Sequence, residues 1–150
     1  VGPIYRYLYS RVGTVSQAEE LTSQVLMAAL EGLPRYRERG NFAGWLFTIA
    51  RHKVTDYYRR RRDHLPLNEG LDGHAQDPLA QVIHDEQLKR LSTLLTTLGE
   101  DKKEMLRLRF AADLTYRQIG EVVGRSEAAV KMAIRRVLRR LEAEWEVNDG

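Results

Sequence analysis

Basic and aromatic side chains gather in the first half of the chain. Arg35, Arg37 and Arg39 occupy alternate positions, and Arg51 and Lys53 follow a segment that contains Trp and Phe. Guanidinium and ammonium groups bind phosphates, whereas exposed aromatic rings stack on unpaired bases. These residue types therefore indicate a surface for single-stranded nucleic acid.

The same stretch also has an ordinary structural interpretation. Phe42, Trp45 and Ile49 could form a core, and the four arginines at 59–62 could be a solvated helix end. Four consecutive residues wind through about 300° of a helix and cannot share one face. Cations at that position also complement the negative end of the helix dipole. At this point both interpretations stay open.

Capping motifs and apolar periodicity predict the helices that position these residues. Ser16 and Glu19 match a capping box, so a helix should begin there and end at Gly32 and Pro34. Asn41 is a good cap for the next helix. The apolar positions expected on that second helix are Phe42, Trp45, Leu46, Ile49, Ala50, Val54, Tyr57 and Tyr58.

A sharper motif lies near the end of the chain. Thr115 and Gln118 form a second capping-box match, Gly124 supplies a turn residue, and Ser126 can cap the helix that follows. The apolar face of this last helix is expected to hold Val130, Ile134, Val137, Leu138, Leu141 and Trp145. The order helix, tight turn, helix predicts a helix-turn-helix.

A helix-turn-helix places the start of its second helix in the major groove of DNA. There Glu127, Ala128, Lys131 and Arg135 should meet base edges, because Lys and Arg donate to guanine and Glu accepts from cytosine. The remaining arginines of this segment suit phosphate contacts. The alternative is an ordinary pair of packed helices with a solvated basic face.

The 150-residue chain is predicted to be all-α, with two small helical domains joined by a flexible linker. Residues 64–78 are polar and hold two Pro and two Gly, which is typical of a linker. The predicted domains are therefore 1–63 and 79–150. Helices are expected over 79–98 and from about Asp101.

Several function classes are disfavoured. The chain has no Cys, which excludes disulfides and thiolate chemistry. His64, His74 and His84 lack the spacing and the companion carboxylate of a metal site. We therefore expect no metal, no cofactor, no catalytic residue, no small-molecule substrate and no enzymatic activity. No apolar run approaches the ~20 residues of a membrane span, so direct membrane insertion is not expected either.

With both halves in view, the chain resembles the bacterial sigma-70 family, in its smallest group, the extracytoplasmic function (ECF) sigma factors. The segment from Ala18 to Leu30 resembles region 2.2, the segment from Tyr36 to Asp56 resembles regions 2.3 and 2.4, and Leu114 to Leu141 resembles region 4.2. The resemblance implies a cytoplasmic factor that directs core RNA polymerase to promoters and assists promoter melting.

The resemblance also implies partners and contact residues. The beta-prime clamp of core RNA polymerase would bind Glu19, Glu20, Leu21, Gln24 and Met27. The minus-10 element of promoter DNA would bind Asn41, Trp45, Arg51, His52, Asp56 and Arg59. The minus-35 element would bind Arg125, Ser126, Glu127, Ala128, Lys131, Arg135 and Arg136. The beta flap and an anti-sigma factor are further implied partners.

Two alternatives accompany this interpretation. The chain could be a stand-alone helix-turn-helix regulator whose first unit dimerises it, or a helical protein-interaction module whose basic faces meet an acidic partner. The first helix starts abruptly at Val1, which suggests a truncated or short variant.

Overall fold

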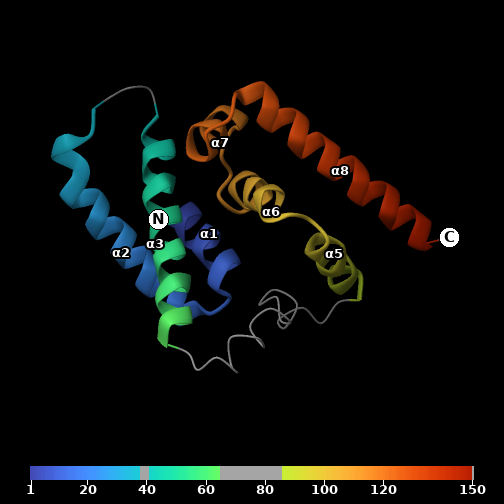
Figure 1. Ribbon diagram of the computed structural model, residues 1–150, viewed down its shortest axis with the longest axis horizontal. Coiled ribbons are helices and arrows are strands. Elements are labelled where there is room, and N and C mark those ends of the chain that lie inside the picture. The colour runs from blue at the N-terminus through green and yellow to red at the C-terminus, as the bar shows by residue number, and fades with distance from the viewer. Residues whose placement is uncertain (38–40, 65–85, 150) are drawn as a thin grey trace. The chain divides into compact units, whose positions relative to one another are not determined.

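The computed structural model describes residues 1–37, 41–64 and 86–149, and all regular structure in these ranges is helical. This confirms the predicted all-α fold. The chain divides into two compact units, Val1–Pro78 and Leu79–Gly150 (Figure 1). Apart from His64, the predicted linker 64–78 lies outside the described residues, as do residues 79–85 of the next predicted helix. Across the described ranges, no helix combines the length and hydropathy that crossing a membrane requires.

The first unit packs three helices against one another. They are α1 (Gly2–Val12), α2 (Val15–Gly32) and α3 (Phe42–His64), with a short 3-10 turn at Leu33–Arg35 after α2. Tyr7 of α1 meets Phe47 of α3 edge to face, with 5.8 Å between ring centroids. The buried apolar residues are Ile4, Tyr7, Leu8, Val12, Ala18, Leu21, Val25, Ala29, Phe47, Ala50 and Val54.

The junction between α1 and α2 corrects the first capping prediction. Gly13 takes the left-handed conformation (φ 77°) that ends α1. The next residue, Thr14, is extended, and its hydroxyl accepts the amide hydrogen of Gln17 at 3.4 Å. The helix therefore begins at Val15, and Ser16 lies inside its first turn rather than capping it.

The start of α3 agrees with the sequence prediction, but its face is narrower. The Oδ1 of Asn41 accepts the amide hydrogen of Gly44 at 3.2 Å, which confirms the cap. Along α3 only Gly44, Phe47, Ala50 and Val54 are buried. Phe42 is 50% exposed, which contradicts the interpretation of this residue as core and favours the alternative, an exposed aromatic ring. Only the stripe turned toward α1 and α2 is covered.

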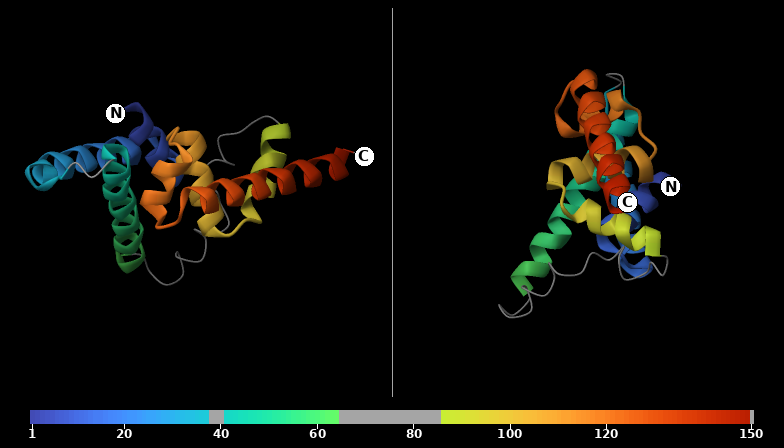
Figure 2. Two further views of the ribbon diagram at one scale, coloured as in Figure 1. Left: turned by 90° about the horizontal axis from the view of Figure 1, so that it is seen from above. Right: turned by 90° about the vertical axis from the view of Figure 1, so that its right-hand side faces the viewer.

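The second unit is arranged around one long helix. It comprises α5 (Glu86–Thr96), α6 (Glu100–Leu106), a π-helical segment (Arg107–Ala111), α7 (Tyr116–Val123) and α8 (Glu127–Asp149). Helix α8 contacts α5, α6 and α7 (Figures 1 and 2). Arg90 of α5 lies 4.4 Å from the Trp145 ring and donates to the Trp145 carbonyl at 2.6 Å.

The core of this unit follows the predicted period of α8, with one exception. Val130, Ile134, Val137 and Leu141 are buried, whereas Leu138 is 41% exposed, contrary to expectation. Leu138 lies one residue past Val137 and is thus rotated by about 100° away from the covered stripe. Leu94 and Leu98 of α5 pack on Val137 and Leu141.

The connection between the π-helical segment and α7 takes an unusual form. The amide of Ala112 donates to the Arg107 carbonyl at 3.0 Å, which closes a π-type turn. Asp113 then adopts a left-handed conformation with φ 58°, a position that favours Gly. The Arg109 guanidinium donates to the Leu114 carbonyl at 2.9 Å and so closes this turn.

Candidate nucleic-acid interfaces

The minus-10 candidates are mostly on one stripe of α3. Trp45, His52, Asp56 and Arg59 fall within about 60° of arc because they are spaced by seven, four and three residues. His52 and Arg59 are exposed, and the other two are half-buried. Arg51 lies roughly 110° away on another side of the helix. The helix therefore brings four of the six candidates together and separates Arg51, while Asn41 precedes the helix as its cap.

An ion pair orders part of this stripe. An Arg59 nitrogen lies 3.1 Å from an Asp56 carboxylate oxygen, three residues earlier on the helix. Both side chains are substantially exposed, so the pair contributes little to stability. Its geometric effect is to hold the guanidinium along the helix surface next to Asp56, where a phosphate or a base edge could accept its remaining hydrogens.

Three aromatic rings form a cluster at the start of α3. The Trp45 ring centroid is 4.8 Å from that of Tyr36 and 5.6 Å from that of Phe42. A Cβ on Gly32 would lie 3.2 Å from the Trp45 ring, so this glycine gives the indole its space. The half-exposed Phe42 ring makes the cluster a surface on which an unpaired base can stack. The sequence left open whether these aromatic residues form a core or an exposed stacking surface, and it did not predict that Tyr36 joins them.

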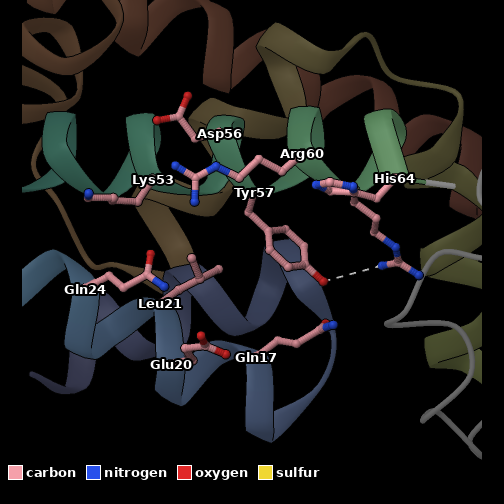
Figure 3. A pocket seen from close by; sticks show the side chains of 10 residues that line it. Gln17, Glu20, Leu21, Gln24, Lys53, Asp56, Tyr57, Arg60 and His64 are labelled. Carbon is pink, nitrogen blue, oxygen red and sulfur yellow. Dashed lines mark hydrogen bonds between the residues drawn. The ribbon is translucent and has the colours of Figure 1, made fainter.

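A polar groove of about 270 Å³ lies between α2 and α3 (Figure 3). Its cationic wall comes from α3, and the hydroxyl of Tyr57 accepts a hydrogen from Arg61 at 3.5 Å. The opposite wall comes from α2, which contributes Glu20 and the buried Leu21, only 3% exposed. The lining residues are Gln17, Glu20, Leu21, Gln24, Lys53, Asp56, Tyr57, Arg60, Arg61 and His64.

This groove joins two candidate sets that the sequence treated separately. Glu20 and Gln24 were expected to meet a protein, whereas Asp56 was expected to meet DNA. Lys53 and the arginines at 59–62 were considered as phosphate-binding cations, but Lys53 and Arg60 were not assigned to the minus-10 set. Their spacing of seven residues on a predicted helix could have shown that they share a face. Together they add positive charge beside the Asp56 side of the stripe.

The outer surface of α2 suits a protein partner. Glu19 and Glu20 are exposed, Met27 is 62% exposed and Leu30 is 70% exposed. Exposed apolar side chains near carboxylates are typical of a protein contact rather than a nucleic-acid contact. Leu21 is buried, so this candidate packs beneath the exposed residues of α2 and does not itself form the outer surface. Leu30 was not predicted.

The helix-turn-helix has the geometry that its sequence predicted. The Thr115 hydroxyl accepts the Gln118 amide hydrogen at 3.1 Å, and the Thr115 amide donates to the Gln118 side chain at 2.9 Å, which confirms the capping box. Gly124 has φ 76° and ends α7. A Cβ on Gly120 would lie 2.4 Å from the Arg125 carbonyl oxygen, so only glycine permits this turn.

The start of α8 presents a polar and cationic face. Glu127, Ala128, Lys131 and Arg135 span about 100° of arc and are all exposed. Ser126 is occupied locally, because its hydroxyl accepts the Ala129 amide hydrogen at 3.1 Å and thereby caps α8. The four exposed side chains of this face can therefore reach base edges, while the Ser126 cap fixes the start of α8.

The two remaining minus-35 candidates flank this face. Arg125 lies in the turn, and its guanidinium is 3.6 Å from the Asp101 carboxylate of α6. Arg136 is exposed and lies about 100° beyond Arg135 around the helix. Both positions fit phosphate contacts on either side of a major groove. Within the described ranges no group of three or more His, Cys, Asp or Glu side chains could hold a metal ion.

Comparisons with known proteins agree on one family. The family model for sigma-70 region 2 matches residues 1–64, and that for sigma-70 region 4 matches residues 94–143. The ECF RNA polymerase sigma factor SigD of Mycobacterium tuberculosis is 34% identical over 153 residues, covering 94% of this chain and 71% of that protein. The ECF RNA polymerase sigma factor BldN of Streptomyces coelicolor is 32% identical over 143 residues, covering 92% of this chain. This chain spans only 54% of BldN.

A solved structure shares the fold. The sigma factor RpoE from Bartonella quintana, crystallised with the anti-sigma factor NepR, superposes with a TM-score of 0.68. The aligned region covers 96% of this chain and 90% of the RpoE chain, at 23% sequence identity. Both the helical elements and their order along the chain thus have a counterpart in a known structure.

Proposed function

Because the chain belongs to the sigma-70 family, in its ECF group, we propose that it directs core RNA polymerase to specific promoters and assists their melting. The observation that carries the proposal is the pairing of two different surfaces in one chain. Helix α3 offers cations beside a cluster of aromatic rings, and α8 offers cations at the start of a helix-turn-helix. These surfaces suit unpaired and paired DNA respectively.

In the proposed mechanism α3 holds the minus-10 element after its bases separate. Opening a duplex costs a few kcal/mol of lost stacking per base, and aromatic rings offset about 1–3 kcal/mol for each base that they stack. Trp45 and Phe42 supply such rings, while His52 and Arg59 face the strand. Asn41 fixes the start of α3 and so places these side chains. Asp56 orients Arg59, and Arg51 acts from a neighbouring side.

Helix α8 reads the minus-35 element as duplex. Lys131 and Arg135 donate to base acceptors, Glu127 accepts from cytosine, and Ala128 contacts a thymine methyl group. Arg125 and Arg136 bind phosphates on the two sides. Ser126 sets the start of α8 through its cap. No bond is made or broken by these residues, so the proposed role is not enzymatic and requires no cofactor.

The remaining assignments concern protein partners and boundaries. The exposed acidic and apolar side of α2, with Glu19, Glu20, Gln24 and Met27 above Leu21, would dock on the beta-prime clamp of core RNA polymerase. The second unit would also touch the beta flap. We assign 1–63 to region 2, 64–78 to a linker and 79–150 to region 4. An anti-sigma factor is a further proposed partner, and the cytoplasm, where polymerase acts, is the proposed location.

The test is binding to bacterial core RNA polymerase by gel filtration, followed by transcription from a promoter library. We expect stoichiometric co-elution and specific transcripts, and weaker co-elution of Glu20→Lys because charge reversal removes the acidic contact. The matched control is Glu121→Lys, an exposed carboxylate of α7 outside the proposed clamp surface. Folding of each variant is checked by circular dichroism.

Two outcomes would overturn the proposal. Absence of both co-elution and specific transcripts with a folded chain would leave a protein-interaction module as the better explanation. Tight, sequence-specific duplex binding without polymerase, combined with no co-elution, would instead indicate a stand-alone regulator.

A further inference from the structure

Methionine supplies all the sulfur of this chain. The sequence contains three Met and no Cys, so any oxidation of sulfur must occur at a methionine. Met105 is buried in the second unit at 1% exposure, whereas Met27 is 62% exposed and Met132 is 49% exposed. A dissolved oxidant must reach the sulfur to convert it to the sulfoxide, so Met27 and Met132 are the two accessible positions.

Met27 belongs to the surface of α2 that was assigned above to a protein partner. Around the helix it lies about 20° from Glu20 and about 60° from Gln24. Leu30, 70% exposed, follows three residues later and extends the same apolar patch. A thioether suits such a patch because it is flexible and apolar. A partner that covers the patch must therefore remove water from the group at position 27.

Met132 lies in the cationic part of α8. Between residues 127 and 140 this helix carries one Lys and four Arg against a single Glu, whereas residues 141–149 carry four acidic residues and no basic one. Around the helix Met132 falls between Arg135, about 60° to one side, and Arg136, about 40° to the other. It therefore lies on the face assigned to DNA, although it was not among the minus-35 candidates.

We propose that Met27 and Met132 are oxidation sites through which a peroxide switches off both binding surfaces of the chain. The sulfur attacks one peroxide oxygen, so that a sulfur–oxygen bond forms and the oxygen–oxygen bond breaks. The transferred hydroxyl gives its proton to the departing hydroxide, and water leaves. Sulfur is oxidised by two electrons and the peroxide is reduced by two. The effect on binding rests on the proposed promoter function, whereas the reactivity of the two sulfurs does not.

The sulfoxide changes the two surfaces in different ways. At Met27 it places a polar group in an apolar contact, where a covering partner removes its hydrogen bonds to water. At Met132 the sulfoxide oxygen is a hydrogen-bond acceptor one turn before Arg135 and Arg136. Each guanidinium hydrogen donated to that oxygen is withdrawn from a base or a phosphate. Oxidation therefore weakens polymerase docking at one position and promoter binding at the other.

The first measurement identifies the sites of oxidation. The full chain is treated with hydrogen peroxide, the reaction is stopped with catalase, and sulfoxide at each methionine is followed by mass spectrometry of peptides. We expect Met27 and Met132 to react at least about tenfold faster than Met105, because a buried sulfur is reached only through local opening. Reaction of either exposed methionine no faster than that of Met105 would overturn the proposal.

The second measurement compares binding before and after peroxide. Anisotropy of the labelled chain with core RNA polymerase reports on Met27, and anisotropy of a labelled minus-35 duplex at saturating polymerase reports on Met132. We expect oxidation to weaken each interaction by about tenfold or more, since each loses or diverts hydrogen bonds at a contact. Circular dichroism checks that the oxidised chain is folded, and an unfolded oxidised chain would overturn the proposal.

Variants separate the two sites. Met27→Leu leaves Met132 as the exposed sulfur, so peroxide should weaken its duplex binding and spare its polymerase binding. Met132→Leu should show the reverse. Each variant is compared with itself before and after peroxide, so the effect of the substitution alone cancels. Met105→Leu, the matched control in the core, should stay as sensitive to peroxide as the unaltered chain. Methionine sulfoxide reductases A and B, one for each sulfoxide epimer, should restore binding.

The remaining outcomes separate this proposal from the promoter function. Peroxide sensitivity that persists in the double variant Met27→Leu, Met132→Leu would overturn the proposal, because the peroxide would then act elsewhere. An active chain whose binding survives complete oxidation would overturn this proposal alone. An unoxidised, folded chain that binds neither core polymerase nor promoter DNA would instead overturn the promoter function, and the switch with it.

Discussion

The faces of α3 and α8 carry similar cations but differ in what accompanies them. On α3, Arg59 shares its helix with Trp45, whose ring contacts two further aromatic side chains. At the start of α8, Lys131 and Arg135 are accompanied by the short side chain of Ala128, and no aromatic ring is on this face. Both surfaces attract phosphates, but only α3 can engage the flat face of a base.

Charge alone therefore does not distinguish a surface for single-stranded DNA from a surface for double-stranded DNA. In a duplex the base faces are covered by their neighbours, so a reading helix needs donors that fit into the groove. In a separated strand the base faces are free, so stacking contributes most. Positioning differs as well. Helix α8 is placed by a tight glycine turn, whereas the α3 rings are held by packing on one another and beside Gly32.

The largest expected effect is that of Gly120→Ala, which should break the α8 surface and spare α3. Its new Cβ would lie 2.4 Å from the Arg125 carbonyl oxygen, so the turn must shift. We expect the free energy of unfolding of the second unit to fall by about 3 kcal/mol. Binding of minus-35 duplex with core polymerase should be lost. Chemical denaturation and anisotropy measure the two effects.

The matched control is Gly99→Ala, since a Cβ at Gly99 has nothing within 4 Å. Stability of Gly120→Ala equal to that of Gly99→Ala would show that the turn does not constrain α8.

Next in size is Trp45→Ala, which should act on the opposite surface. Loss of one stacking ring should weaken binding of a single-stranded minus-10 oligonucleotide to the polymerase complex by about 1–3 kcal/mol. Minus-35 duplex affinity should be unchanged. Phe110→Ala, which removes a 61% exposed ring from the second unit, is the control and should alter neither. If Trp45→Ala weakens both DNA forms equally, the proposed difference between the faces is wrong.

A finer distinction within α8 comes from Arg135→Ala and Arg136→Ala. In the proposed mechanism Arg135 contacts bases, so its loss should cost about 1.5 kcal/mol on the preferred minus-35 sequence and relax specificity at one base pair. Arg136 is proposed to contact phosphates, so its loss should weaken all sequences alike and flatten the log–log salt dependence by about 0.9. Titrations over a range of salt concentrations with two duplexes measure both. An identical sequence profile for the two variants would contradict the assignment.

The smallest expected effect is that of Asp113→Gly. This variant should change the stability of the second unit without changing the DNA-binding faces of α3 and α8. Asp113 has φ 58°, where a Cβ is unfavourable, so Gly should raise the free energy of unfolding by about 1 kcal/mol. Asp113→Ala keeps the Cβ and should not. Thermal unfolding compares them, and equal melting temperatures would mean that the left-handed turn stores no strain.

Local motifs accounted for most of the second unit. The capping box at Thr115, the turn at Gly124 and the cap at Ser126 were all predicted, because each depends on residues within a few positions of one another. The start of α2 in the first unit was not predicted correctly, because a local motif does not decide it. Thr14 and Ser16 are both good caps, and what decides between them is the left-handed end of the preceding helix at Gly13.

Other features depend on neighbours far apart in the sequence. The groove between α2 and α3 is lined by residues of both helices, including Leu21 and Tyr57, and no local pattern in the sequence specifies which residues of the two helices share it. The sequence could not decide whether Phe42 is buried or exposed, because an aromatic residue at helical spacing fits a core and a stacking surface equally well. The π-helical segment at Arg107–Ala111 likewise has no period of its own in the sequence.

The reversal of charge along α8 has a kinetic consequence. A helix that is positive at one end and negative at the other is a permanent electric dipole, fixed in the frame of the second unit. In the field of a polyanion, such a dipole experiences a torque before any contact forms. The unit would therefore approach DNA with the start of α8 foremost, and added salt would slow the association by randomising that orientation.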